Sequence, residues 1–134
     1  MLADDPLGSQ REACSAPLCI GYGEAFASID ADPNNELIVG VIDDVIVGMF
    51  QITFIPYLTY KGRWRALIEG VRVSSTIRSR GVGEAMLHWA IDRARIRNCI
   101  MVQLTTDVLR EDALRFYERM GFVSSHHGMK FHLE

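Results

Sequence analysis

The chain has 134 residues, of which 49% are hydrophobic and 23% are charged, a composition typical of one folded domain with its own core. A formal net charge of −3 leaves no surplus of positive charge of the kind that sequence-independent binding to nucleic acid requires. We therefore expect a single domain over residues 1–134, without a nucleic-acid partner.

The cysteines and the lengths of the apolar runs indicate the cellular compartment of the protein. The three cysteines cannot all pair and show no Cys-x-x-Cys spacing, so we expect reduced thiols in a cytoplasmic protein. The longest apolar runs, at 37–42 and 45–55, end well short of the roughly 20 residues that a membrane helix needs. Asp4 and Asp5 stand where a secretory signal would carry positive charge. We expect neither export nor a membrane anchor.

The first half of the chain predicts a helix and then a hairpin. Apolar residues recur at helical spacing from Leu18 to Ile29, and the turn at 32–34 ends this helix. Two runs rich in β-branched residues, 36–42 and 45–56, are separated only by Asp43-Asp44. This pattern indicates an antiparallel hairpin.

A third strand is predicted at 63–74. Strict alternation along it puts Leu67, Glu69, Val71 and Val73 on one face, and it puts Ile68, Gly70 and Arg72 on the other. Glu69 would therefore lie among apolar neighbours.

The second half predicts two helices. The first begins near Gly83, and its apolar face is formed by Val82, Ala85, Met86, Trp89, Ala90 and Ala94. A short strand at 100–104 follows, and then a helix with the stripe Ala113, Phe116, Tyr117 and Met120, which stops at Gly121. We expect two last strands at 122–125 and 129–133. This order predicts an α/β domain of the α+β type, with a mixed sheet that is not doubly wound.

The segment Arg78-Ser79-Arg80-Gly81-Val82-Gly83 precedes the first of these two helices. Glycines let the backbone approach a ligand closely, and the first-turn N–H groups of a helix bind anions. The segment lacks the Gly-Lys-Ser/Thr of a P-loop and the third glycine of a dinucleotide-binding fingerprint. It predicts a phosphate-binding loop of another kind, and the alternative is a plain turn that starts a helix.

The chain resembles the GNAT acetyltransferases, whose hallmark Arg/Gln-x-x-Gly-x-Gly/Ala is matched by Arg78, Gly81 and Gly83. A second hallmark, Ala-x-x-Phe-Tyr-x-x-x-Gly-Phe, is matched from Ala113 to Phe122. The resemblance implies a central mixed sheet flanked by helices and acetyl-CoA as co-substrate. The pyrophosphate would bind the loop formed by Ser79, Arg80, Gly81, Val82 and Gly83, with charge added by Arg78, and the pantetheine arm would pair with the backbone near Val71 and Val73.

The resemblance also implies the catalytic groups. Tyr117 would protonate the departing thiolate, and the alternative is a core aromatic residue on an amphipathic helix. Glu69 is our candidate for the general base that deprotonates the amine, since partial burial would raise its pKa. The alternatives are a water chain as base and, for Glu69, an exposed side chain or an ion pair with Arg65 or Arg72.

Two departures from the family pattern stand out. Arg110 replaces the asparagine that many relatives carry, and it would contact CoA phosphates or cover the helix surface. The usual first strand is absent, so Met1–Asp5 is expected to be the tail of a helix in a natively longer chain.

No metal site is expected, because His126, His127 and His132 lack spaced Cys, Asp or Glu partners.

The sequence therefore predicts an acyl-CoA-dependent N-acetyltransferase that acts by direct transfer on the primary amine of a small molecule. A protein or peptide N-terminus is the alternative acceptor, and a non-catalytic acyl-CoA sensor is the alternative class. Because exposed sheet edges are costly in so small a chain, we also expect a homodimer. The identity of the amine lies in loops, which the sequence does not resolve.

Overall fold

The computed structural model describes residues 1–13 and 15–134, and these divide into two units, 1–103 and 104–134. The first unit contains α1 (Gly8–Arg11), α2 (Ile20–Ala31), β1 (Asn35–Ile42), β2 (Val45–Ile55), α3 (Thr59–Gly62), β3 (Arg65–Val73), the 3-10 turn η1 (Ser75–Ile77) and α4 (Val82–Ile96). Strand β4 (Met101–Leu104) ends where the second unit begins, and that unit contains α5 (Glu111–Arg119). No helix in the described part of the chain is both long enough and apolar enough to cross a bilayer.

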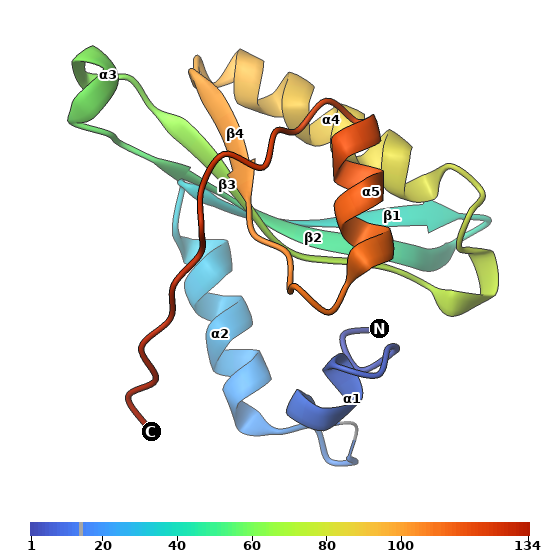
Figure 1. The fold of residues 1–134 in the computed structure, drawn as a ribbon. Coiled ribbons are helices and arrows are strands. Elements are labelled where there is room, and N and C mark those ends of the chain that lie inside the picture. The colour runs from blue at the N-terminus through green and yellow to red at the C-terminus, as the bar shows by residue number, and fades with distance from the viewer. Residues whose placement is uncertain (14) are drawn as a thin grey trace. The chain divides into compact units, whose positions relative to one another are not determined.

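The strands form one sheet in the order β1-β2-β3-β4, in which β2 pairs antiparallel with both β1 and β3 (Figure 1). The hairpin between β1 and β2 turns at Asp43 and Asp44, whose φ values of 49° and 62° are both left-handed. Such a pair of residues is what a two-residue type I′ turn requires. The predicted hairpin is therefore confirmed, and the α/β fold with a mixed sheet flanked by helices matches the expectation.

The core of the first unit lies between the sheet and α4, which runs along one face of the strands in Figure 1. Its buried residues are Val47, Phe50, Ile52 and Phe54 of β2, Ala66 and Ile68 of β3, and Met86, Leu87, Ala90 and Ala94 of α4. The predicted helix is confirmed, but its apolar face is rotated from the prediction. Leu87 is fully buried, whereas Trp89 is 44% exposed, so that the stripe centres on the buried Met86, Leu87, Ala90 and Ala94.

A β-bulge interrupts β3. Gln51 pairs with Glu69 and Met49 pairs with Arg72, so the single residue Phe50 stands opposite two residues of β3. Gly70, one of these two, has a left-handed φ of 63°, a conformation that costs other residues about 1–2 kcal/mol.

The bulge reverses the faces of the second half of β3. Val73 pairs with Gly48, which adjoins Met86 of α4, whereas Arg72 pairs with Met49. The predicted alternation is therefore wrong beyond Gly70, because one extra residue shifts the register of a strand by one position. Val71 and Val73 lie on the α4 side, and Arg72 shares the opposite face with Glu69.

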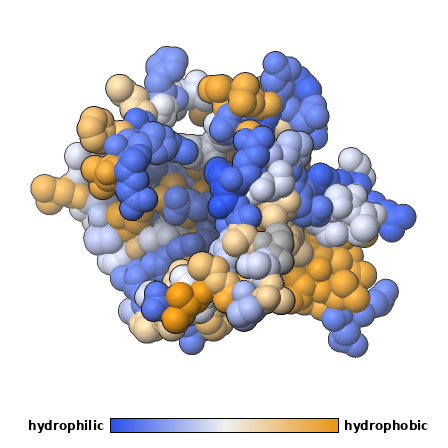
Figure 2. All heavy atoms as spheres, turned by 90° about the horizontal axis from the view of Figure 1, so that it is seen from below, coloured by the Kyte–Doolittle hydropathy of each residue, from blue (hydrophilic) through white to orange (hydrophobic). Residues whose placement is uncertain are grey.

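The helix α2 matches the predicted range, and an Asx turn ends it, in which the Asn34 amide donates to Asp32 Oδ1 at 2.8 Å. None of its residues is buried. Exposed apolar side chains also occur on the β1-β2 hairpin, namely Val39, Val41, Ile42, Val45 and Ile46. Figure 2 shows apolar and hydrophilic residues side by side on the face that it displays.

In the second unit, the predicted helix is confirmed as α5, which is followed by Gly121 with a left-handed φ of 94°. The strands predicted at 122–125 and 129–133 are not formed, since none of these residues belongs to a strand. Alternation of apolar and polar residues favours an extended segment, but a strand exists only where another strand accepts its backbone hydrogen bonds.

Candidate phosphate-binding loop and active site

The loop between η1 and α4 has the backbone of an anion site. Ser79 and Gly81 have left-handed φ values of 66° and 80°, and Gly81 is the N-cap residue of α4. Among the described residues, no side chain caps this helix. The first-turn N–H groups of Val82, Gly83 and Glu84 therefore have no partner within the helix and no side-chain acceptor in the part of the chain that the structure describes. Uncapped N–H groups at a helix start attract anions such as phosphate.

The two arginines of the loop differ. Arg80 is exposed, and within the described residues it makes no hydrogen bond or ion pair, so its charge is available to a ligand. The guanidinium of Arg78 instead bonds to the chain. Its Nε donates to the Val73 carbonyl at 3.1 Å, and its Nη2 donates to the carbonyl oxygen of Asp4.

Asp4 brings the amino-terminal segment to this loop, a contact that the sequence analysis missed. Its carboxylate accepts hydrogen bonds from the Ser75 amide at 2.8 Å and from Ser75 Oγ at 3.0 Å. The Ser75 amide is the main reason why the pKa of Asp4 lies below its usual value, with the Ser75 hydroxyl next. Asp4 and Asp5 were notable in the sequence only as negative charges near the start, and no spacing links Asp4 to Ser75, which is 71 positions away.

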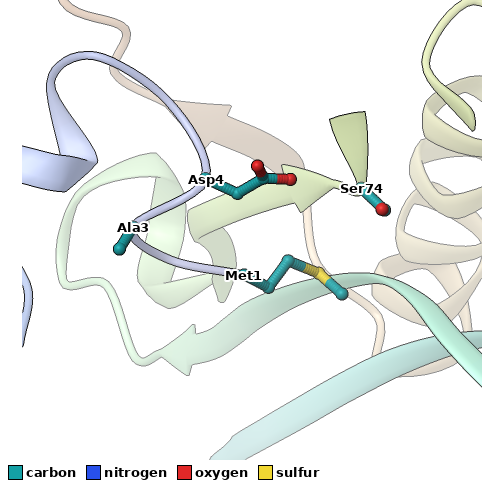
Figure 3. Close-up of a pocket in the computed structure, with 4 residues that line it drawn as sticks. All are labelled: Met1, Ala3, Asp4 and Ser74. Carbon is teal, nitrogen blue, oxygen red and sulfur yellow. The ribbon is translucent and has the colours of Figure 1, made fainter. Parts of the chain in front are cut away.

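The segment at Met1–Asp5 is formed by turns, so the expected helix tail is wrong; the first helix, α1, begins at Gly8. The backbone N–H of Asp4 donates a hydrogen bond to the Met1 carbonyl and closes one of these turns. The turns border an open pocket of about 380 Å³ beside the end of β3. Figure 3 shows its lining by Met1, Ala3, Asp4 and Ser74.

Beyond the bulge, the backbone of β3 has one side that is turned away from β2. The Ser74 amide donates to the Val47 carbonyl of β2, and successive residues of a strand direct their backbone groups to opposite sides. The N–H and C=O groups of Val71 and Val73 therefore point away from β2. In this structure, Arg72 Nη1 donates to the Val71 carbonyl at 2.8 Å, while Arg78 occupies that of Val73.

Glu69 lies just before the bulge and is exposed, so the apolar surroundings expected for it are wrong. It pairs across the sheet with Gln51. Neither predicted ion pair is formed, because Arg72 Nε contacts Asp5 Oδ2 at 3.2 Å and Arg65 stacks on the Tyr57 ring at 4.4 Å. Within the described part of the chain, the Glu69 carboxylate has no hydrogen bond or ion pair, and it is open to solvent.

The remaining predicted residues belong to the second unit. Tyr117 is half-buried on α5 between two aromatic rings, with centroid distances of 5.3 Å to Phe116 and 5.9 Å to Phe122. Arg110 is the N-cap residue of α5, and its amide donates to the Asp107 carbonyl at 2.9 Å. Among the described residues, no group of three or more His, Cys, Asp or Glu side chains could hold a metal ion.

The chain is similar to known acetyltransferases. The family model described as acetyltransferase (GNAT) family matches residues 7–122. A Salmonella typhimurium protein named aminoalkylphosphonate N-acetyltransferase is 29% identical over 105 residues, which cover 78% of this chain and 68% of that protein. A Saccharomyces cerevisiae protein named N-alpha-acetyltransferase 30 is 32% identical over 71 residues, which cover 53% of this chain and only 40% of that protein.

A solved structure is also similar along almost the whole chain. It is described as a transcriptional regulator from Bacillus halodurans, with a TM-score of 0.97 and 56% sequence identity. The match covers 99% of this chain and 89% of that one.

Proposed function

Since the chain belongs to the acetyltransferase (GNAT) family, we propose that it transfers the acetyl group of acetyl-CoA directly to the primary amine of a small molecule. The observation that carries this proposal is the uncapped start of α4 behind the left-handed residues Ser79 and Gly81. These backbone N–H groups fit a pyrophosphate, and Arg80 adds an exposed positive charge.

The second support for the cofactor is the outward side of β3 beyond Gly70. Val71 and Val73 offer backbone N–H donors on the side of β3 turned away from β2, while their carbonyls accept from the Arg72 and Arg78 side chains. An amide-containing arm binds such an edge as an added strand would. Residues 79–83 would hold the pyrophosphate, and Val71 and Val73 the pantetheine arm. We propose Arg110 as a further contact to the cofactor.

Acetyl-CoA supplies an acetyl group activated as a thioester. The amine nitrogen then has to lose two protons, because an alkylammonium ion with a pKa near 10 must become a neutral amine before it can attack and must lose a second proton as the amide forms. The departing sulfur gains one proton. We assign the first proton to the Glu69 carboxylate, directly or through water. We assign the second exchange to Tyr117: its hydroxyl would protonate the departing sulfur, and the phenolate would take up the second proton of the nitrogen.

A small-molecule acceptor is supported by the Salmonella relative, whose name gives an aminoalkylphosphonate as its substrate. The yeast relative, named as an N-alpha-acetyltransferase, favours a protein N-terminus as the second candidate. Turnover distinguishes the two. We expect release of free CoA thiol from acetyl-CoA with members of a panel of small primary amines, aminoalkylphosphonates included, at rates well above those with peptides of free N-terminus.

A sensor that binds acyl-CoA without transferring the acyl group is the remaining candidate, favoured by the similar structure described as a transcriptional regulator. The same assay separates it from an enzyme. Binding of acetyl-CoA without thiol release across both panels would support the sensor and contradict the transferase.

A further inference from the structure

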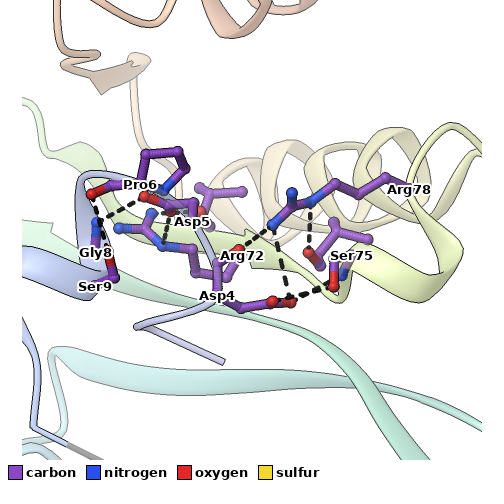
Figure 4. A network of polar contacts seen from close by, with 10 residues as sticks. Asp4, Asp5, Pro6, Gly8, Ser9, Arg72, Ser75 and Arg78 are labelled. Atoms are coloured by element: carbon purple, nitrogen blue, oxygen red, sulfur yellow. Dashed lines mark hydrogen bonds and ion pairs between the residues drawn. The ribbon is translucent and has the colours of Figure 1, made fainter.

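We infer that Asp4 is a positioning residue for the phosphate-binding loop, an inference that rests on the proposed function. Figure 4 shows its carboxylate between the amino-terminal segment and η1. The Ser75 amide and hydroxyl both donate to it, so a residue 71 positions earlier in the chain caps the turn that leads into the loop. This contact fixes the beginning of η1.

Asp4 also holds the residue at which the loop departs from η1. Arg78 Nη2 donates to the Asp4 carbonyl and lies 3.9 Å from its carboxylate Oδ2, while Arg78 Nε donates to the Val73 carbonyl. The backbone of Arg78 is extended and leads directly into the left-handed Ser79. Two fixed points on the Arg78 side chain thus restrain the backbone just before the groups that would face the pyrophosphate.

The tether positions the loop only if the segment that carries Asp4 is itself held. Asp5 provides the anchor, because its Oδ2 lies 3.2 Å from Arg72 Nε and both side chains are about nine-tenths buried. Its Oδ1 accepts a hydrogen bond from the Gly8 amide at 2.7 Å. A Cβ atom at Gly8 would lie only 2.1 Å from the Leu2 carbonyl oxygen, so the turn is closely packed.

This arrangement makes a prediction whose sign distinguishes two roles for Asp4. A loop held in its binding conformation loses less conformational freedom when the ligand binds, and affinity is then higher. If Asp4 acted only through its negative charge near Arg78, its removal would strengthen the binding of an anion. Positioning predicts weaker binding after the same substitution.

The test is the dissociation constant of CoA, measured by calorimetry for the wild type, Asp4→Ala and Asp4→Asn. We expect Asp4→Ala to raise it about tenfold, in line with the loss of a charged hydrogen-bonding group. Asp4→Asn should have a smaller effect, because it keeps an oxygen acceptor for Ser75. The matched control Asp43→Asn removes the same charge from the β1-β2 turn and should leave the constant within about twofold, since asparagine tolerates a left-handed φ.

Kinetics separate positioning from a general structural role. For a positioning residue, the KM for acetyl-CoA rises by the same factor in Asp4→Ala, while kcat at saturation is retained. A merely structural role would lower the active fraction, and with it kcat, at an unchanged KM. Ser75→Ala should also raise the dissociation constant of CoA by a smaller factor in the Asp4→Ala background than in the wild type, because the two residues share a contact.

The outcomes are distinct from those of the proposed function. A wild type that does not bind CoA overturns the proposed function and, with it, this inference. A wild type that binds CoA, together with an unchanged or tighter constant in both Asp4 variants, overturns the inference alone.

Discussion

Tyr117 and Glu69 carry the two proton transfers of the proposed reaction, and substitutions at these positions test each transfer separately. Tyr117→Phe keeps the ring between Phe116 and Phe122 and removes only the hydroxyl. We expect kcat to fall about 100-fold, the lower range for loss of a general acid. Full turnover with an unchanged pH dependence would remove Tyr117 from the mechanism.

Glu69→Gln removes the proposed base with almost no change in shape. Because Glu69 is exposed and has no charged partner among the described residues, the substitution should leave stability nearly unchanged. We expect the rate near neutral pH to fall about 100-fold. The rate should recover as the pH approaches the pKa of the amine substrate, because the amine is then neutral without a base. An unaltered pH–rate profile would assign the proton to water or to another group.

Asp4 couples stability to pH. Its pKa is lower in the folded chain because the Ser75 amide and hydroxyl bond to the carboxylate form. A carboxyl group with a lowered folded pKa stabilises the fold fully above its unfolded value of about 4, and this contribution is lost as the pH falls through the folded value. Wild type should therefore be more stable than Asp4→Asn at pH 7, and the difference should shrink below about pH 4 in denaturant titrations. A difference that stays constant with pH would contradict the assignment.

At the scale of elements, the bulge in β3 determines which residues face the proposed cofactor edge. Gly70→Ala meets no neighbouring atom but places an alanine at a φ of 63°, so we expect it to lower the free energy of unfolding by about 1–2 kcal/mol. Because the bulge also turns Val71 and Val73, the KM for acetyl-CoA should rise.

Gly23→Ala is the matched control for this change. Gly23 lies inside α2 with ordinary helical backbone and has no atom within 4 Å of an added Cβ. Alanine should stabilise the chain there by about 0.5–1 kcal/mol, since it loses less conformational freedom than glycine in a helix. A Gly70→Ala variant whose free energy of unfolding is higher than that of the wild type would contradict the strain assigned to the bulge.

At the scale of the whole molecule, the elements with strong local signals were predictable from the sequence. The Asp43-Asp44 turn between β-branched runs and the apolar periodicity of 82–94 both depend on neighbours in the chain. The two motifs at 78–83 and 113–122 likewise led to the family. Each of these features is specified by residues a few positions apart.

The features that were missed depend on distant partners. The bulge at Gly70 follows from the register of β3 against β2, and the Asp4–Ser75 contact joins segments 71 positions apart. Likewise, the alternation at 129–133 could not show whether a partner strand is present. The exposed apolar residues of β1, a strand at the edge of the sheet, favour a homodimer, which stays a prediction.

The central claim is that the loop at the start of α4 binds acetyl-CoA. The most direct measurement is the thermal stability of the chain with and without acetyl-CoA, since a ligand that binds only the folded state stabilises it by mass action. Wild type should gain several degrees at millimolar acetyl-CoA, and Gly83→Glu, which puts a negative side chain in the first turn of α4, should gain none. An equal gain in both proteins, or no gain in the wild type, would contradict the claim.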